Sequence, residues 1–126
     1  MYDVVVVGAR CAGASTALLL ARQGHRVLLL DRARFPSDMA LSTHLVWPRG
    51  VAKLTEWGLG ETLAGSGAPP LRTARMDFGE LVLEGPLHPA GDVAEAYAPR
   101  RAVLDGLLVD AAVEAGAELR ESCTVQ

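Results

Sequence analysis

The apolar positions of the first thirty residues change their spacing twice. Val4–Val7 is a continuous run of β-branched side chains, which is typical of a strand buried on both faces. Residues 14–23 instead carry apolar side chains at helical spacing, namely Ala14, Ala17, Leu18 and Ala21. Gly24 stands where many helices end in a left-handed residue, and Arg26–Leu30 is a second apolar run. The pattern predicts one β–α–β unit of roughly 30 residues.

The middle of the chain predicts a second helix and a hairpin. Pro48–Trp57 places three apolar side chains on one helical face, and residues 60–64 add a further turn of helix. Residues 72–84 alternate between apolar and charged side chains, with Gly79 first in a two-residue turn. We therefore expect an antiparallel hairpin that is half exposed and lies outside the parallel sheet.

The last third of the chain predicts a strand, a helix and a strand. Residues 94–99 are a short strand candidate, and Arg100-Arg101 precede an amphipathic helix that ends at Gly116. The buried stripe of this helix is expected to hold Leu104, Leu107, Leu108, Ala111 and Ala115. Residues 117–125 are the last strand candidate.

Together these elements predict an α/β fold with a parallel sheet. Three parallel strands are expected, at residues 3–7, 26–30 and 117–125, whereas a doubly wound sheet usually has five or six. We therefore interpret the chain as an N-terminal piece of a longer protein, in which the C-terminal strands of the sheet are absent.

The turn between the first strand and the first helix has the composition of a phosphate-binding loop. It runs Gly8-Ala9-Arg10-Cys11-Ala12-Gly13. Gly8 permits a sharp turn, and Gly13 allows the helix to pack closely on the strand. The first N–H groups of the helix have no internal partners and attract a pyrophosphate. Asp31 ends the second strand, where a carboxylate can accept hydrogen bonds from both ribose hydroxyls of an adenosine.

Arg10 departs from the dinucleotide-binding pattern G-x-G-x-x-G, which has glycine at this position. Its side chain must either point away or place its guanidinium beside the phosphates. The thiol of Cys11 either packs under the loop, which we favour, or ionises more easily beside the helix N-terminus. A β–α–β unit that binds no nucleotide is the alternative to a nucleotide site.

The composition narrows the class of protein. Half of the 126 residues are apolar and 21% are charged, which fits one soluble globular domain. A net charge of −3 and an aromatic content of 5% give no reason to expect nucleic acid. The N-terminal apolar run is too short for a signal peptide or a membrane span, and Cys11 lies far from Cys123, so a reduced, cytoplasmic setting is expected. No cluster has the spacing of a metal site or a catalytic motif, so no catalytic residue is assigned.

The segment DVVVVGARCAGASTALLLARQGHRVLLLDRARFP resembles the N-terminus of FAD-dependent monooxygenases, the family of para-hydroxybenzoate hydroxylase and the geranylgeranyl-reductase-like enzymes. Most members have GAGPAG in the loop, and a branch with GARCAGA is similar to this chain. STH at 42–44, PRGV at 48–51, WGL at 57–59 and PRRAVLDGLLVDAA at 99–112 fit the same family. The resemblance implies that residues 1–126 are the N-terminal part of a Rossmann-like FAD-binding domain. It also implies that residues 70–99 are an excursion toward the substrate-side sheet.

The resemblance implies FAD as the cofactor and suggests which residues bind it. The candidates are Gly8, Ala9, Arg10, Cys11, Ala12, Gly13, Asp31, Arg32, His44 and Arg101. Arg101 begins the family's R-x-x-L-x-x-x-L pattern and would hold the pyrophosphate or ribityl oxygens; the alternative is a solvated helix start. His44 is either close to the flavin or a loop histidine without such a contact.

Arg32 and Arg34 have a second interpretation. Two arginines at this place would also bind the 2′-phosphate of NADP. Asp31 would repel that phosphate, so solvated surface arginines are favoured over an NADP site.

Three functions are compatible with these observations. In the first, the chain is part of an FAD-dependent oxidoreductase, and the fragment alone is inactive. The resemblance implies that the complete enzyme reduces FAD with NAD(P)H and then hydroxylates a small organic substrate or reduces an isoprenoid double bond. In the second, the chain is the NAD(P)-binding domain of a dehydrogenase. In the third, it is a non-catalytic module that pairs with a complementary chain, or with itself, through its unfinished sheet.

Overall fold

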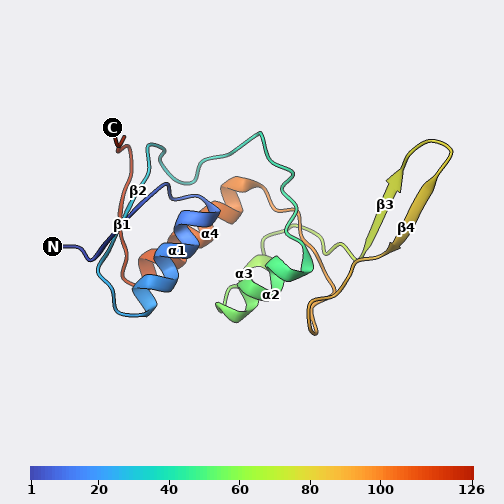
Figure 1. Ribbon diagram of the computed structural model, residues 1–126, viewed down its shortest axis with the longest axis horizontal. Helices are drawn as coiled ribbons and strands as arrows, with labels where there is room; N and C mark the ends of the chain where they lie inside the picture. Colours follow the sequence, from blue (N-terminus) through green and yellow to red (C-terminus); the bar gives the residue numbers. More distant parts are fainter. The chain divides into compact units, whose positions relative to one another are not determined.

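Two strands from the start of the chain and one from its end form a parallel three-stranded sheet (Figure 1). Its strands are β1 (Val4–Val7), β2 (Val27–Leu30) and β5 (Glu118–Arg120), in the order β1-β2-β5. Both pairs are parallel, and Val4 of β1 pairs with Val27 of β2. The predicted β–α–β unit and parallel sheet are therefore confirmed.

The computed structural model describes every residue from Met1 to Gln126, and it divides the chain into two units. The first unit consists of residues 1–42 together with residues 100–126. The second unit consists of residues 43–99. None of the helices has the length and apolar character that a membrane span requires.

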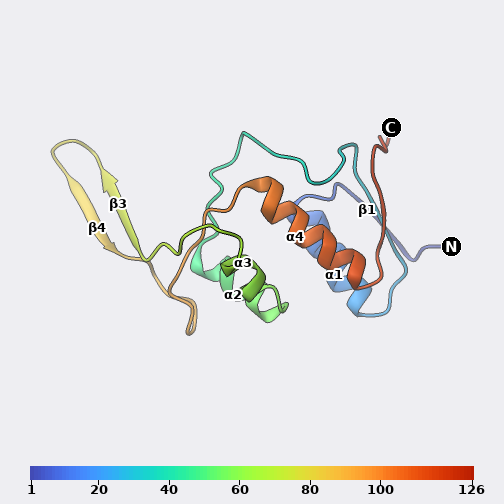
Figure 2. The ribbon, with the colours of Figure 1, turned by 180° about the vertical axis from the view of Figure 1, so that it is seen from behind.

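Two helices cover one face of the sheet in the first unit. They are α1 (Cys11–Arg22) and α4 (Arg101–Glu114), which pack against each other (Figures 1 and 2). The four positions predicted for the α1 core are all buried. Gly24 follows α1 with a φ of 89°, as the predicted helix end requires.

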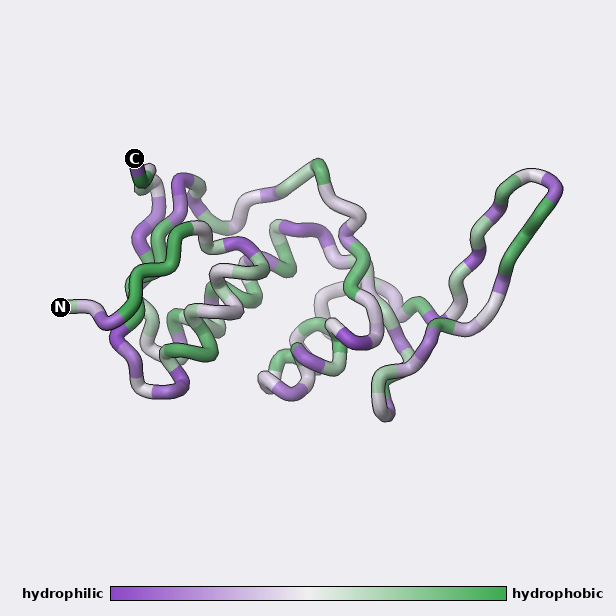
Figure 3. The backbone as a smooth tube through the Cα atoms, viewed as in Figure 1, coloured by the Kyte–Doolittle hydropathy of each residue, from purple (hydrophilic) through white to green (hydrophobic).

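The opposite face of β1 is bare. Val5 is 54% exposed and Val7 is 62% exposed, although this strand is among the most hydrophobic stretches of the backbone (Figure 3). The prediction that Val4–Val7 is buried on both faces is therefore wrong. The reason is position in the sheet: β1 lies at an edge, whereas β2 lies between two strands and is buried over its whole length.

The C-terminal elements differ from the sequence prediction in two respects. Leu107 of α4 and the C-cap residue Ala115 are only half-buried, and the fully buried Asp105 belongs to the core face instead. The strand predicted at 117–125 is only three residues long. Ser122 has a φ of 55°, and this left-handed residue interrupts the extended chain.

The second unit holds two helices and a hairpin. The helices are α2 (Pro48–Glu56) and α3 (Gly60–Ala64), and the strands are β3 (Thr73–Asp77) and β4 (Val82–Pro86). The hairpin is antiparallel, and Gly79 opens its two-residue turn with a φ of 83°, as predicted. Its strands are exposed on both faces at most positions, which is more than the half exposure expected.

The strand predicted at residues 94–99 does not form. Only isolated bridges occur there, between Ala96 and Leu71 and between Tyr97 and Val46. The segment makes single pairs with two different partners, so no continuous ladder can develop.

Gly13 provides a test of the packing between α1 and β1. A Cβ at Gly13 would stand 1.7 Å from the Gly8 carbonyl oxygen, so Gly13→Ala should lower the free energy of unfolding by about 3 kcal/mol or more. The matched control is Gly106→Ala in α4, where no atom lies within 4 Å of the added Cβ. This control should raise stability by about 0.5–1 kcal/mol, because alanine favours a helix over glycine. Urea unfolding measures both changes; equal stability of the two variants would contradict the packing.

Candidate functional site

The turn from β1 into α1 leaves room for an anion. Gly8 has a φ of 98°, and no atom lies within 4 Å of the position where its Cβ would stand. Arg10 is the N-cap residue of α1, but no side chain caps the helix and its first turn contains no acidic residue. The first N–H groups of α1 and the positive end of its dipole therefore fit a phosphate group.

Asp31 connects the end of β2 to this turn. Its carboxylate is buried, and its Oδ2 accepts a 2.7 Å hydrogen bond from the Ala9 N–H. Its Oδ1 accepts a 2.8 Å bond from the Ala33 N–H. Each oxygen of a carboxylate can accept a second hydrogen bond. Asp31 therefore holds the loop in place and keeps acceptor capacity for a hydroxyl group of a ligand.

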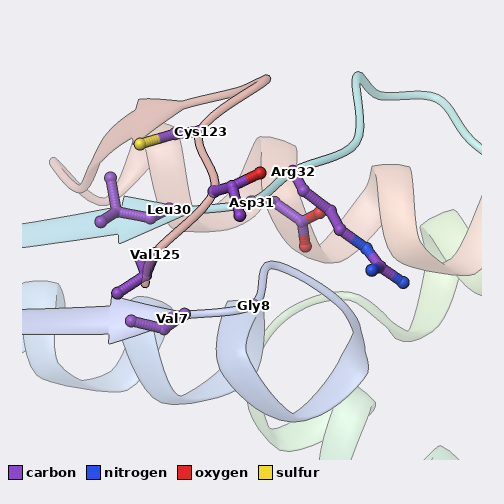
Figure 4. A pocket seen from close by; sticks show the side chains of 8 residues that line it. Val7, Gly8, Leu30, Asp31, Arg32, Cys123 and Val125 are labelled. Atoms are coloured by element: carbon purple, nitrogen blue, oxygen red, sulfur yellow. The ribbon is translucent and has the colours of Figure 1, made fainter.

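A hollow of about 280 Å³ opens beside Asp31 at the carboxyl end of the parallel strands (Figure 4). Its lining combines apolar side chains with one carboxylate, and comprises Val7, Gly8, Leu30, Asp31, Arg32, Cys123, Thr124 and Val125. Apolar walls next to a hydrogen-bond acceptor fit the base and the ribose of a nucleoside. Arg32 is exposed, and its guanidinium extends away from the apolar side chains of the hollow (Figure 4).

The Arg10 side chain points to α4 and to the loop after β2. Its Nη1 donates to Asp105 Oδ2 at 2.7 Å and to the Ser37 carbonyl at 2.8 Å. Its Nη2 donates to Ser37 Oγ at 2.6 Å, and the guanidinium lies over the Phe35 ring at 5.3 Å from the centroid. The sequence allows the side chain either to point away or to place its guanidinium beside the phosphates. The structure has the first orientation, in which the guanidinium binds these protein groups.

Asp105 is the residue that sequence reasoning missed. Its side chain is completely buried on α4, and it bonds three donors: Arg10, Arg101 and the Cys11 thiol. A signal was present in the sequence, because an acid in the middle of an apolar helix face, four residues after an arginine, needs a partner inside the protein. Its contacts with α1 depend on residues almost a hundred positions apart.

Arg101 lies where the sequence placed a cofactor-binding residue, at the start of α4. Its Nε and Nη2 donate to Asp105 Oδ1 at 3.1 and 2.9 Å, and the side chain is 17% exposed. Its Nη1 lies 3.5 Å from Ser42 Oγ. The guanidinium therefore stands beside the first residue of α1, because Cys11 donates to the same carboxylate oxygen.

The environment of Cys11 opposes ionisation. Burial raises the pKa of the Cys11 thiol to about 11, and the hydrogen bond to Asp105 and the charge of Asp105 act in the same direction. The positive charge of Arg101 lowers this pKa, but not enough to compensate. The alternative that the Cys11 thiol ionises more easily is therefore wrong. The favoured alternative, in which the thiol packs under the loop, agrees with the structure.

His44 belongs to the second unit. It is half-buried and has a φ of 58°. The other candidates, Gly8 to Gly13, Asp31, Arg32 and Arg101, all belong to the first unit. The hollow, the open helix end and the arginine at α4 together fit an adenosine followed by a diphosphate.

Comparison with known proteins gives a family for these features. The family model described as FAD binding domain matches residues 1–126. The menaquinone reductase of Mycobacterium tuberculosis is 50% identical over 62 residues, which are 49% of this chain and 15% of that protein. The phenazine 1,6-dicarboxylic acid hydroxylase PhzS of Lysobacter antibioticus is 34% identical over 115 residues, covering 89% of this chain and 28% of that protein.

A solved structure has the same fold. The myxobacterial chondrochloren halogenase CndH, described as a variant of FAD-dependent halogenases, superposes with a TM-score of 0.86 at 28% identity. The match covers 96% of this chain and 28% of that chain. The chain thus spans less than a third of the length of each of these three relatives.

The environment of Cys11 leads to a prediction about its reactivity. In a Cys123→Ser chain, Cys11 should react with iodoacetamide at pH 8 roughly 100-fold more slowly than an unperturbed thiol, because only the thiolate attacks. The rate should continue to rise above pH 9, where the reaction of a free thiol levels off. The same alkylation of the urea-unfolded chain is the control, and a rate equal to that control at pH 8 would contradict the buried contact.

Proposed function

Because the chain belongs to the FAD binding domain family, we propose that its first unit binds the ADP half of FAD for a flavin-dependent oxidoreductase. The observation that carries this proposal is the combination of the hollow beside Asp31 with the uncapped N-terminus of α1. FAD, when bound, supplies the redox chemistry. The residues of the chain supply placement, hydrogen bonds and charge.

The adenosine is proposed to occupy the hollow. Asp31 would accept hydrogen bonds from the ribose hydroxyls, while Val7 and Leu30 would contact the base. The diphosphate would then lie over the loop, whose members Gly8, Ala9, Arg10, Cys11, Ala12 and Gly13 would contact it through the backbone. Arg32 would contribute from the rim of the hollow.

Arg101 is proposed to hold the middle of the cofactor. Its Nε and Nη2 donate to Asp105, and its Nη1 makes only a long, 3.5 Å hydrogen bond to Ser42 Oγ. Nη1 is therefore the outer edge of the guanidinium that would donate to phosphate or ribityl oxygens. His44 is kept as a candidate for the flavin end of the cofactor.

The complete enzyme is proposed to be an NAD(P)H-dependent monooxygenase of a small organic substrate. The support comes from PhzS, a hydroxylase of a small aromatic acid that matches 89% of this chain. The alternative of a dehydrogenase domain that binds NAD(P) is not favoured, since the FAD binding domain family covers residues 1–126.

A second candidate function is association through the sheet. Val5 and Val7 expose more than half of their surface on β1, and β1 has a neighbour on one side only. An apolar face next to an unpaired strand edge favours pairing with a complementary chain or with a second copy.

The proposed adenosine site can be tested through Cys123, which lines the hollow. In a Cys11→Ser chain, ADP at ten times its Kd should slow alkylation of Cys123 about tenfold, because roughly a tenth of the chains stay open. Inorganic pyrophosphate at the same saturation is the control and should leave the rate unchanged, since it lacks the nucleoside.

The binding of FAD itself tests the role of Asp31. Calorimetric titration should show binding of FAD and ADP, and Asp31→Asn should weaken both at least fivefold through the lost ribose contacts. Stabilisation of the chain by NAD but not by FAD would contradict the assignment and support the dehydrogenase alternative.

The association through β1 makes a separate prediction. Replacing Val5 and Val7 with threonine removes apolar surface from the bare face while keeping β-branched side chains. Light scattering should show that the unmodified chain self-associates with rising concentration and that the double variant does so less. A monomer at all concentrations in the unmodified chain would count against self-association through this face.

A further inference from the structure

We propose that Asp105 is a positioning residue for the cofactor, because it orients the guanidinium of Arg101 and anchors that of Arg10 at the N-terminus of α1. This proposal rests on the proposed function, in which Arg101 contacts FAD. It adds a residue that lies in the interior of the protein and that would act through its two arginine partners.

The two oxygens of Asp105 have different partners. Oδ2 accepts from Arg10 Nη1 at 2.7 Å, and Oδ1 accepts from Arg101 Nε and Nη2 at 3.1 and 2.9 Å. Both donors on one edge of the Arg101 guanidinium reach the same oxygen, so the contact is side-on and fixes which edge faces Asp105. A side-on contact leaves Nη1 at the far end, where it can donate to another group.

Arg10 and Arg101 differ in how many donors they retain. Both N–H groups of Arg10 Nη1 are used, by Asp105 and the Ser37 carbonyl, and Nη2 donates to Ser37 Oγ. The Arg10 side chain therefore links α1 to α4 and to the loop at Ser37 through hydrogen bonds. Arg101 Nη1 makes one long hydrogen bond of 3.5 Å, to Ser42 Oγ, and its second N–H group remains for a ligand.

The charges of the three side chains do not cancel. Asp105 is fully buried, while the side chains of Arg10 and Arg101 are 24% and 17% exposed. One carboxylate between two guanidinium groups leaves one positive charge at the partly exposed side, next to the positive end of the α1 dipole. A diphosphate is the part of the proposed cofactor that matches this surplus.

The test compares FAD with AMP, which lacks the second phosphate and the ribityl chain. Asp105→Asn keeps the shape of the side chain. It should lower the affinity for FAD at least tenfold, while the affinity for AMP changes less than twofold. Calorimetry measures FAD binding and NMR titration measures AMP binding. An unchanged or tighter FAD affinity would overturn the proposal. If the orientation of Arg101 did not matter, removing the negative charge of Asp105 would make the site more positive and would strengthen binding of the anionic cofactor.

A double-variant cycle separates an indirect role from a direct one. If Asp105 acts through Arg101, Arg101→Met should lower the affinity for FAD as much as Asp105→Asn does. The double variant should then be no weaker than Arg101→Met alone. Independent, multiplying losses would show that Asp105 does not act through Arg101.

Arg101→Lys decides the matter if Asp105→Asn does not fold. Lysine keeps the charge but lacks the planar fork, so it cannot be held side-on and donate outward at once. Its FAD affinity should fall nearly as far as that of Arg101→Met. Affinity close to that of the unmodified chain would mean that charge alone suffices, and would overturn the positioning role.

Cys11 gives a readout that needs no ligand. Because its thiol donates to Asp105 Oδ1 at 3.1 Å, Asp105→Asn in a Cys123→Ser chain should accelerate alkylation of Cys11 severalfold. An unchanged rate would show that the carboxylate does not stand at the start of α1. Failure of the unmodified chain to bind both AMP and FAD would refute the proposed function and, with it, this role. Binding of both without an effect of Asp105 would refute the role alone.

Discussion

A β carbon on Gly13 would stand 1.7 Å from the Gly8 carbonyl oxygen, so α1 and the end of β1 approach each other more closely than any side chain permits. This approach fixes where the helix begins relative to the sheet. Gly8 leaves open space beside the turn and the first turn of α1 has no side-chain cap, and both are needed for an anion to reach the backbone N–H groups. The glycines at 8 and 13 therefore have separate tasks, one in the turn and one in the packing.

Two buried carboxylates hold the elements around this turn. Asp31 joins the turn to the end of β2 by accepting from the Ala9 N–H, and Asp105 joins the start of α1 to α4 by accepting from Arg10. Burying a carboxylate is costly unless charged or N–H donors surround it, and each of these acids has such donors. The polar contacts that shape the loop are thus also the ones that place charge next to it.

Arg10 shows how a turn of the G-x-G-x-x-G type accommodates a large residue in place of the middle glycine. The guanidinium turns toward Ser37 and Asp105, so the bulk of the side chain leaves the space in front of α1. The exchange needs a carboxylate on α4, because a partly buried guanidinium without an anionic partner would be unstable. Arg10 and Asp105 are therefore expected to depend on each other.

The local elements could be predicted from the sequence. The spacing of apolar residues, Gly24 and Gly79 located α1, its end and the hairpin turn, because these features depend on neighbours within a few residues. Asp31 could be placed at the end of β2 for the same reason. Exposure could not be predicted, because it depends on which strand lies at the sheet edge, and Val5 and Val7 have the composition of a buried strand but lie on a bare face.

The cluster of Arg10, Cys11, Arg101 and Asp105 was decided only by the tertiary structure. Its members come from two helices separated by most of the chain, and no local pattern states that α4 packs against the start of α1. By itself, the sequence determined the turn, the helix and the acid that follows β2. Packing decided where the Arg10 side chain points and which carboxylate receives it, since a buried charge finds its partner through the fold and not through its neighbours in the chain.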